Sequence, residues 1–367
     1  MRMSMRTFGA QLALCLALVG FSGPGHAASL FMGAYPDSLV IFDDANGDLK
    51  ERIPLGGLPR CMRASADKKT IFVMTITQSG VDVIDVASRK VTTSFNLNTP
   101  TTRYRINCGT PDPTGKFYYA VVTKINKEID RYSVEKSRFA VIDLEKKAIV
   151  RMHDFEKEDE ETFRDLRGGL EISEDGKYLY HFGDKVVILD TADFKVVERI
   201  QLAKPDLPGF EGVRFGEAME AMRQPGEYVS LFNAEDPLVH NRVFGVARFD
   251  LDARKFTFTP IGPSPAAMTG LHIAPNKRDA YAVINTGTLG NKRCEFWHFD
   301  LRTNGVRQKR EFDCKSRFSF GISLDGRKLY IYGASYDLEV YNANTLAHER
   351  TWDLQNDITG AGYVAVN

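Results

Sequence analysis

Apolar and polar residues alternate in short stretches along most of the chain, a period-two pattern typical of β-strands with one buried face. One unit recurs seven times: an alternating apolar run ending in Asp or Asn, a short turn, and a second extended run. The copies are LVIFDD, VDVIDV, FAVIDL, VVILDT, VARFDL, FWHFDL and LEVYNA. Their aligned polar residues are Asp43, Asp85, Asp143, Asp190, Asp250, Asp300 and Asn342. Each copy predicts a β-hairpin whose turn begins at that residue.

A second hairpin precedes most copies, seen clearly in DPTGKFYYAVV, EISEDGKYLYHFG and GISLDGRKLYIYGA. The glycines of these turns, Gly115, Gly176 and Gly326, supply the positive φ that a tight hairpin requires. Seven units of four strands without helical periodicity predict an all-β, seven-bladed β-propeller over residues 28–367. The unit length of about 49 residues is close to the roughly 40–50 residues typical of propeller blades.

The two ends of the predicted propeller are expected to meet in one blade. The segment ASLFMGAYP at residues 28–36 resembles a second strand, and the tail GAGYVAVN resembles an inner strand without outer partners. We predict that the C-terminal strand joins the three N-terminal strands, which removes exposed sheet edges. The alternative is two β-sandwiches of about 170 residues each.

Residues 1–27 are typical of a secretory signal peptide. Arg2 and Arg6 precede the short apolar run from Leu12 to Val19, and small residues lead to a predicted cleavage near Ala27. The run is far shorter than the roughly 20 apolar residues of a membrane span, so we expect a periplasmic or secreted protein. The alternative is an N-terminal membrane anchor.

The charge balance and the hydrophobic content of the sequence argue against two classes of protein. The 48 Lys and Arg residues balance 48 Asp and Glu residues, which argues against a basic nucleic-acid-binding protein. The hydrophobic content of 43% argues against disorder.

The four cysteines that follow the predicted signal peptide fit two disulfides. Cys61 and Cys108 each lie six residues before the first turn of adjacent blades, close to the expected axis. Cys294 and Cys314 lie ten residues on either side of Asn304, at the turn of a single hairpin. We therefore predict the pairs Cys61–Cys108 and Cys294–Cys314, although four cysteines allow three pairings.

With strands a to d counted outward from the axis, the a–b and c–d turns lie on one side of the ring and the b–c and d–a connections on the other. The long irregular segments, 123–138, 156–168, 202–215 and 233–241, all fall in the second set. Long loops on one rim of a rigid scaffold favour a binding face there.

Residues at the starts of the a-strands are expected to line the entrance on that side: Arg60, Arg63, Arg103, Arg105, Asn107, Arg164, Arg167, Glu217, Glu220, His272 and Arg317. A basic arc opposite one acidic blade could hold an anionic ligand or dock a partner through charge pairs. Alternatively, the arginines pair with neighbouring acids and serve only ring closure. The acidic run 156–161 lacks calcium-loop spacing and is interpreted as a solvated loop.

The sequence contains no motif for a self-contained catalytic centre. It lacks HExxH, GxSxG, a P-loop, GxGxxG and CxxCH, so we predict no catalytic residue, metal site or covalent haem in this chain. A lactonase-like hydrolase would have to rely on Glu217, Glu220, His272 and Asn107. A stand-alone binding propeller would need only the basic arc.

The stretches DGKYLYHFG, DGRKLYIYGA and VDVIDVASRKV resemble YVTN-type β-propellers of exported bacterial proteins. The order of YPDSLVIFDD, SFNLNTP, the long insertion before FAVIDLEKKAIV, and YGASYDLEVYNANTLAHERTWDL is similar to the β subunit of quinohemoprotein amine dehydrogenase. The resemblance implies a periplasmic, cofactor-free subunit. Its partners would be a small quinone-bearing catalytic subunit and a dihaem subunit that contains haem c. It also implies partner docking at 156–168 and 202–215.

Overall fold

The computed structural model describes residues 28–164, 170–183, 185–202, 211–215, 227–236, 238–287, 289–315, 318–333 and 335–366. The predicted signal peptide lies outside these residues. In the described part of the chain, no helix is long and apolar enough to cross a membrane.

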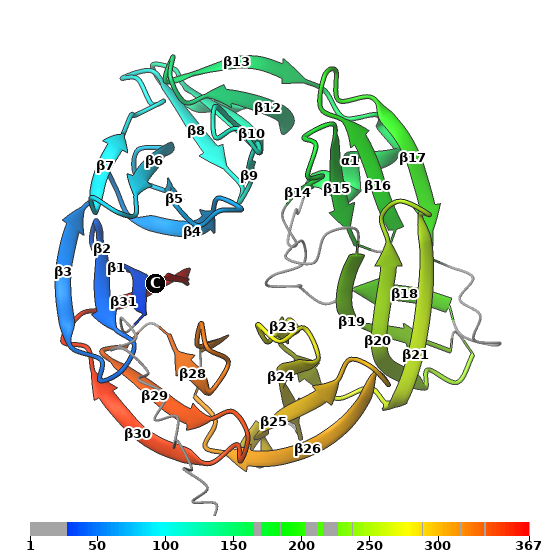
Figure 1. Ribbon diagram of the computed structural model, residues 1–367. Helices are drawn as coiled ribbons and strands as arrows, with labels where there is room; N and C mark the ends of the chain where they lie inside the picture. The colour runs from blue at the N-terminus through cyan, green and yellow to red at the C-terminus, as the bar shows by residue number, and fades with distance from the viewer. Residues whose placement is uncertain are drawn as a thin grey trace, which may run out of the picture.

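Seven antiparallel sheets stand around a central axis, as Figure 1 shows. Blade 1 consists of β31 (Ile358–Val366), β1 (Ser29–Ala34), β2 (Ser38–Asp43) and β3 (Leu49–Pro54), and blade 2 of β4 (Pro59–Ala64), β5 (Thr70–Thr75), β6 (Gly80–Asp85) and β7 (Lys90–Thr93). Blade 3 consists of β8 (Thr102–Ile106), β9 (Thr110–Pro111), β10 (Phe117–Lys127), β11 (Tyr132–Val134), β12 (Arg138–Asp143) and β13 (Ala148–His153). Blade 4 consists of β14 (Glu171–Ile172), β15 (Tyr178–Phe182), β16 (Lys185–Asp190) and β17 (Val196–Gln201).

Blade 5 consists of β18 (Glu211–Phe215), β19 (Glu227–Glu235), β20 (Arg242–Asp250) and β21 (Lys255–Pro263). Blade 6 consists of β22 (Ala267–Met268), β23 (His272–Ile273), β24 (Asp279–Thr286), β25 (Arg293–Asp300) and β26 (Gly305–Phe312). Blade 7 completes the ring with β27 (Ser319–Ile322), β28 (Lys328–Tyr332), β29 (Asp337–Asn342) and β30 (His348–Asp353). Helical turns are short: η1 (Lys157–Asp159), α1 (Glu160–Arg164) and η3 (Leu289–Asn291). The predicted seven-bladed propeller is confirmed.

The predicted closure is also confirmed, because β31 pairs with β1 along a register that runs from Ser29↔Val366 to Ala34↔Ile358. Side chains reinforce this junction from the next blade. The Tyr330 hydroxyl of blade 7 donates to the buried carboxylate of Asp44 in blade 1, and Lys328 binds the same residue. The alternative of two β-sandwiches is wrong.

The hydrophobic core consists of clusters between neighbouring blades. Phe72 and Tyr118 belong to the cluster between blades 2 and 3, and Phe139 and Phe163 to the cluster between blades 3 and 4. A further cluster, which includes Tyr330, joins blade 7 to blade 1. Each sheet therefore buries its two faces against the neighbouring blades.

The seven aligned Asp and Asn residues close the c–d turns. Each side chain accepts a hydrogen bond from a backbone N–H two or three residues further on, for example from Ala192 to Asp190 at 2.6 Å and from Asn344 to Asn342 at 2.9 Å. The residue four positions after each Asp or Asn has a positive φ. These positions are Gly47, Arg89, Lys147, Phe194, Arg254, Asn304 and Leu346. The repeated polar residue is thus a turn-forming device rather than a binding residue.

Both predicted disulfides are present. The Cα atoms are 5.8 Å apart in Cys61–Cys108, which links the inner strands of blades 2 and 3. They are 5.2 Å apart in Cys294–Cys314, which links β25 to the segment after β26.

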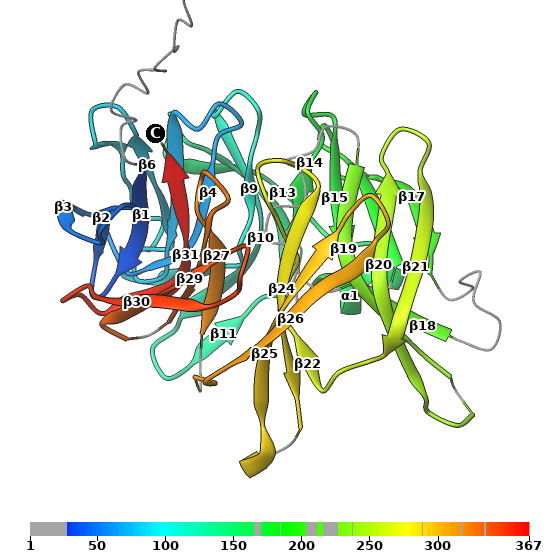
Figure 2. The same cartoon turned by 60° about the horizontal axis from the view of Figure 1, so that its bottom comes forward.

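The strand order places the connections on two opposite sides of the ring. We call the side with the a–b and c–d turns, such as 65–69 and 85–89, the turn face. The side with the b–c and d–a connections, such as 128–137 and 154–164, is the loop face. In Figure 2, β11 and the ends of β22 and β25 project on the loop face, and the C-terminal end of β31 points to the turn face.

Candidate functional site

Four of the predicted entrance residues lie on or next to the inner strands of blades 2 and 3. Arg60 is on β4, Arg103 and Arg105 are on β8, and all three are exposed. Asn107 follows β8, is half-buried, and donates its backbone N–H to the carbonyl oxygen of Val121 at 2.9 Å. The disulfide next to Arg60 and Asn107 holds the two strands side by side.

Two other predicted entrance residues, Arg164 and His272, lie on other elements of the ring. Arg164 is the last residue of α1. His272, at the start of β23, is buried and packs edge-on against Phe320 with a ring-centroid distance of 4.5 Å, so it does not reach the surface. Four positions lie outside the described residues: Arg167, Glu217, Glu220 and Arg317.

Arg63 has a partner that the sequence pattern did not indicate. Its guanidinium binds the buried carboxylate of Glu171 at 2.8 Å and so connects blade 2 to blade 4 near the axis. The negative charge of Glu171 raises the pKa of Arg63 above its ordinary value. For this one arginine, the alternative interpretation of acid pairing and ring closure is correct.

Three of the predicted entrance arginines, Arg60, Arg103 and Arg105, differ from most other arginines of the described residues in their lack of partners. Arg199, Arg248 and Arg254 each form an ion pair shorter than 3 Å. Across the part of the chain that the structure describes, the side chains of Arg60, Arg103 and Arg105 form neither an ion pair nor a hydrogen bond. An uncompensated group of guanidinium ions can bind carboxylates or phosphates.

Exposed apolar side chains also gather on the loop face. Eleven large hydrophobic side chains are exposed in the described ranges, and eight of them are on b–c connections: Tyr35, Ile76, Ile129, Tyr132, Val134, Leu238, Val239 and Tyr336. The remaining three lie in outer strands. Exposed apolar residues that recur on one side of a protein favour a contact surface for another protein.

The acidic run 156–161 is only in part the solvated loop that we expected, because Glu156, Glu158 and Glu161 are exposed whereas Asp159 is buried. The carboxylates of Glu156, Glu158 and Asp159 lie within 4.8 Å of one another, and each binds Arg199 at 2.7 Å. Asp159 is fully buried and also binds Lys185. Burial acts to raise the pKa of Asp159, but the hydrogen bonds from Arg199 and Lys185 outweigh it and the pKa is lowered. Two cations, Arg199 and Lys185, therefore already bind this acidic group, so it is a structural ion network.

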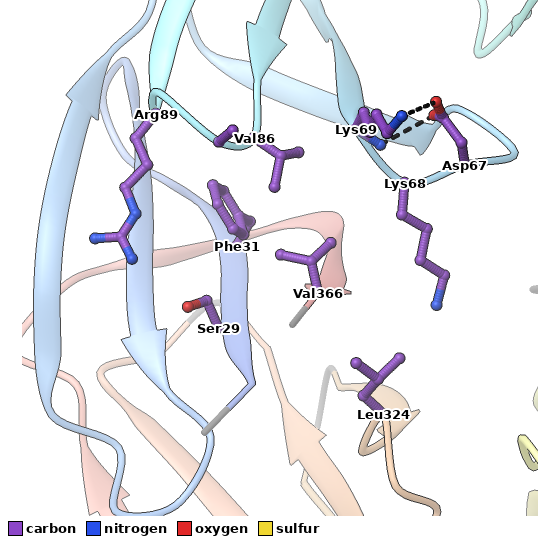
Figure 3. Close-up of a pocket in the computed structure, with 10 residues that line it drawn as sticks. Ser29, Phe31, Asp67, Lys68, Lys69, Val86, Arg89, Leu324 and Val366 are labelled. Carbon is purple, nitrogen blue, oxygen red and sulfur yellow. Dashed lines mark hydrogen bonds and ion pairs between the residues drawn. The ribbon is translucent and has the colours of Figure 1, made fainter. Parts of the chain in front are cut away.

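A pocket of about 500 Å³ lies on the turn face between blades 1 and 2. Figure 3 shows the apolar side chains of Phe31, Val86 and Val366 within it, with Lys69 and Arg89 at its rim. Two of the three cations that line the pocket are partly neutralised, since Lys69 binds Asp67 at 3.7 Å and Arg89 binds Glu51 at 3.3 Å; the third is Lys68.

A smaller pocket of about 180 Å³ lies on the same face, against blades 6, 7 and 1. Asp67 is the only carboxylate among the residues that line these two pockets, and no histidine lines them. Neither lining offers the convergent acid and base groups that hydrolysis requires.

No protein-family profile and no curated protein sequence matches this chain. Solved structures show its fold. A dihydro-heme d1 dehydrogenase, NirN, in complex with DHE is similar with a TM-score of 0.52 and 14% identity over 94% of this chain and 76% of that chain. A functionally unknown protein from Desulfotomaculum acetoxidans is similar with a TM-score of 0.54 and 11% identity over 93% of this chain and 99% of that chain. At these identities, the likeness concerns the fold alone.

Proposed function

We propose that this chain is an exported, non-catalytic propeller subunit that binds partner proteins through its loop face. In this proposal residues 1–27 are removed as a signal peptide and the mature chain acts in the periplasm. The partners are a quinone-bearing catalytic subunit and a dihaem subunit of an amine-oxidising complex, as in quinohemoprotein amine dehydrogenase, whose β subunit the sequence resembles.

The observation that carries the proposal is the distribution of exposed apolar side chains. Of the eleven such side chains in the described residues, eight are on the b–c connections. Ile129 and Leu238, at two hairpin tips, have relative accessible areas of 108% and 87% and are among the most exposed. A free propeller gains nothing from apolar residues at the tips of long loops, whereas a subunit buries them against its partner. The absence of a catalytic motif in the sequence is consistent with a scaffolding role.

The proposal is tested by purification of the tagged full-length chain from the periplasm of its native host under mild conditions. We expect a c-type haem protein, detected by its absorbance, and a small protein that stains for quinone redox cycling. The isolated complex should reduce a dye in the presence of a primary amine. A monomer, or partners without haem and quinone, would overturn the amine dehydrogenase assignment.

A stand-alone ligand-binding propeller remains a second candidate because of the pocket on the turn face. Its mixture of apolar residues and cations would suit a carboxylate that carries an apolar group. Such a protein would be recovered without partners, and its thermal stability would rise in the presence of that ligand.

A further inference from the structure

Blade 3 extends beyond its neighbours on the loop face. β10 is 11 residues long, whereas the equivalent strand β15 of blade 4 has five residues. The additional residues 123–127 of β10 pair with β8 on one side and with β11 on the other. We call this three-stranded extension, formed by β8, residues 123–127 and β11, the outer sheet of blade 3.

The register determines which side chains share a face of the outer sheet. Arg103 is opposite Ile125, which is opposite Val134; Arg105 is opposite Thr123, and Lys127 is opposite Tyr132. Directly paired residues point to the same side of a sheet, and so do residues two apart on one strand. One face, the open face, therefore carries seven side chains: Arg103, Arg105, Thr123, Ile125, Lys127, Tyr132 and Val134.

The opposite face of the outer sheet is already satisfied by polar contacts. Glu135 binds Lys124 at 3.1 Å and accepts a hydrogen bond from Asn126 at 2.9 Å. Arg138 also binds Glu135, at 2.6 Å. The two cations of this face therefore already bind its carboxylate, so neither of them is without a partner.

The open face has the reverse character. It carries three cations and no carboxylate, and Arg103 and Arg105 have no ion pair within the described residues. Tyr132 and Val134 are 64% and 65% exposed. A sheet face that combines unpaired guanidinium groups with exposed apolar side chains is complementary to a surface that is both acidic and apolar.

We propose that the open face of the outer sheet is the docking surface for an acidic, partly apolar segment of a partner protein. Arg103 and Arg105 are two residues apart on one strand, about 6.8 Å, so each guanidinium can bind its own carboxylate. Carboxylates at i and i+2 of a strand, or three to four residues apart on a helix, have suitable spacing. Tyr132, Val134 and Ile125 receive the apolar side chains beside them. Phosphate groups would match the arginines but leave this apolar half uncovered.

The inference rests on the proposed role as a partner-binding subunit and specifies its contact surface. It differs from the docking at 156–168 and 202–215 that the family resemblance implies. It requires only a protein partner, whether or not that partner contains quinone or haem.

A photo-crosslinking amino acid in place of Tyr132 in the full-length chain, expressed in the native host, tests the inference. The same substitution at Tyr336 is the matched control, because Tyr336 is 60% exposed on the loop face at blade 7. We expect position 132 to crosslink to a partner segment that contains at least two carboxylates beside apolar residues. Crosslinks from position 336 alone, or crosslinks from 132 to a segment without carboxylates, would overturn the inference.

Charge reversal supplies a second measurement. Arg103→Glu/Arg105→Glu should lower the amount of partner recovered by about tenfold or more, because it replaces two attractions by two repulsions. Arg278→Glu/Arg350→Glu, which reverses two exposed arginines elsewhere, should leave recovery unchanged. If the Arg103→Glu/Arg105→Glu variant has a lower melting temperature than the parent chain, Arg103→Gln/Arg105→Gln replaces it in the same measurement. Unchanged recovery with either variant would contradict the inference.

The outcomes separate this inference from the proposed function. A crosslinked acidic partner without haem or quinone supports the docking surface and overturns the amine dehydrogenase assignment. A haem and quinone complex that survives charge reversal and crosslinks only through Tyr336 supports the assignment and overturns the docking surface.

Discussion

The two faces of the propeller are held together in different ways. On the turn face each c–d turn is closed by its own residues, an Asp or Asn side chain and a positive-φ residue four positions later. The loop face has contacts between residues far apart in the sequence, such as Asp159 with Arg199 and Cys61 with Cys108. The turn face combines its local closures with contacts of this kind, such as that of Tyr330 with Asp44. Because each c–d turn is closed by its own residues, the connections on the opposite face can vary in length and composition. Most of the exposed large apolar side chains of the described residues accordingly lie on the loop face.

The largest effect should come from the disulfide near the axis. Cys61→Ser/Cys108→Ser opens a loop with a sequence separation of 47 residues. A loop of that length corresponds to a loss of about 4 kcal/mol in the free energy of unfolding. Denaturant unfolding measures the loss, and hydrogen exchange should show faster exchange in β4 and β8 than in the c–d turns. Cys294→Ser/Cys314→Ser, with a separation of 20 residues, should cost about 3 kcal/mol. A larger loss for this second pair would contradict the argument from loop length.

Removal of the buried charge in blade 4 should have the next largest effect. Asp159→Asn leaves Lys185 and Arg199 without their buried partner, and we expect a loss of about 3 kcal/mol in the free energy of unfolding. Glu158→Gln changes a largely exposed carboxylate that binds the same arginine, and it should change the stability by less than about 1 kcal/mol. Equal losses for the two variants would show that burial of Asp159 is not what matters.

The same carboxylate predicts a pH dependence. The pKa of Asp159 in the folded chain is lowered below its ordinary value of 3.8, because its hydrogen bonds to Arg199 and Lys185 outweigh burial. Its contribution to stability is therefore complete above about pH 4 and is lost as the pH falls through the lowered pKa. Unfolding curves between pH 5 and pH 2 should fall more steeply for the parent chain than for Asp159→Asn. Parallel curves would contradict the ion network.

A single turn should contribute less. Asn342→Ala removes the acceptor of two backbone hydrogen bonds, from Asn344 at 2.9 Å and Thr345 at 3.0 Å. The expected loss is about 1 kcal/mol in the free energy of unfolding, which is the size of a typical net hydrogen-bond contribution. Asn344→Ala is the control, because the exposed side chain of Asn344 forms no hydrogen bond within the described residues. Its substitution should change the free energy of unfolding by close to zero.

The smallest effect on the isolated chain is expected at the outer sheet of blade 3. Tyr132→Ser/Val134→Ser should change the melting temperature by no more than about 1–2 °C, because these side chains are exposed and pack against little. Recovery of the partner should nevertheless fall. A strongly lowered melting temperature would show that the two residues serve folding and not docking.

Much of the fold could be predicted because its information is local. The seven Asp and Asn positions, the pairing of the termini and both disulfides follow from spacing along the chain. The contact between Arg63 and Glu171 could not be predicted, since the two residues are 108 positions apart and periodicity does not show which side chains meet near the axis. Asp159 was misinterpreted because its two cations come from other strands.

The outer sheet of blade 3 was only partly accessible from the sequence. The arginines were identified, and the insertion 123–138 was expected on the face where it lies. The expectation that this insertion is irregular was wrong, because residues 123–127 continue β10 and Tyr132–Val134 form β11. The register of β8 and β11 with β10 determines which side chains share one side of the sheet, and these include Arg103, Arg105, Tyr132 and Val134. Alternation in R-x-R and Y-x-V was the available signal, but it does not show which strands pair.

The origin of the innermost strand of blade 1 has a consequence for biosynthesis. Since β31 follows all the other described strands in the chain and pairs with β1, the first of them, six blades can assemble while blade 1 still lacks its inner strand. A product that stops before residue 358 would leave the backbone donors and acceptors of β1 open to other strands. Such fragments should be prone to aggregate or be degraded, so the pairing of β31 with β1 distinguishes a complete ring from an incomplete one.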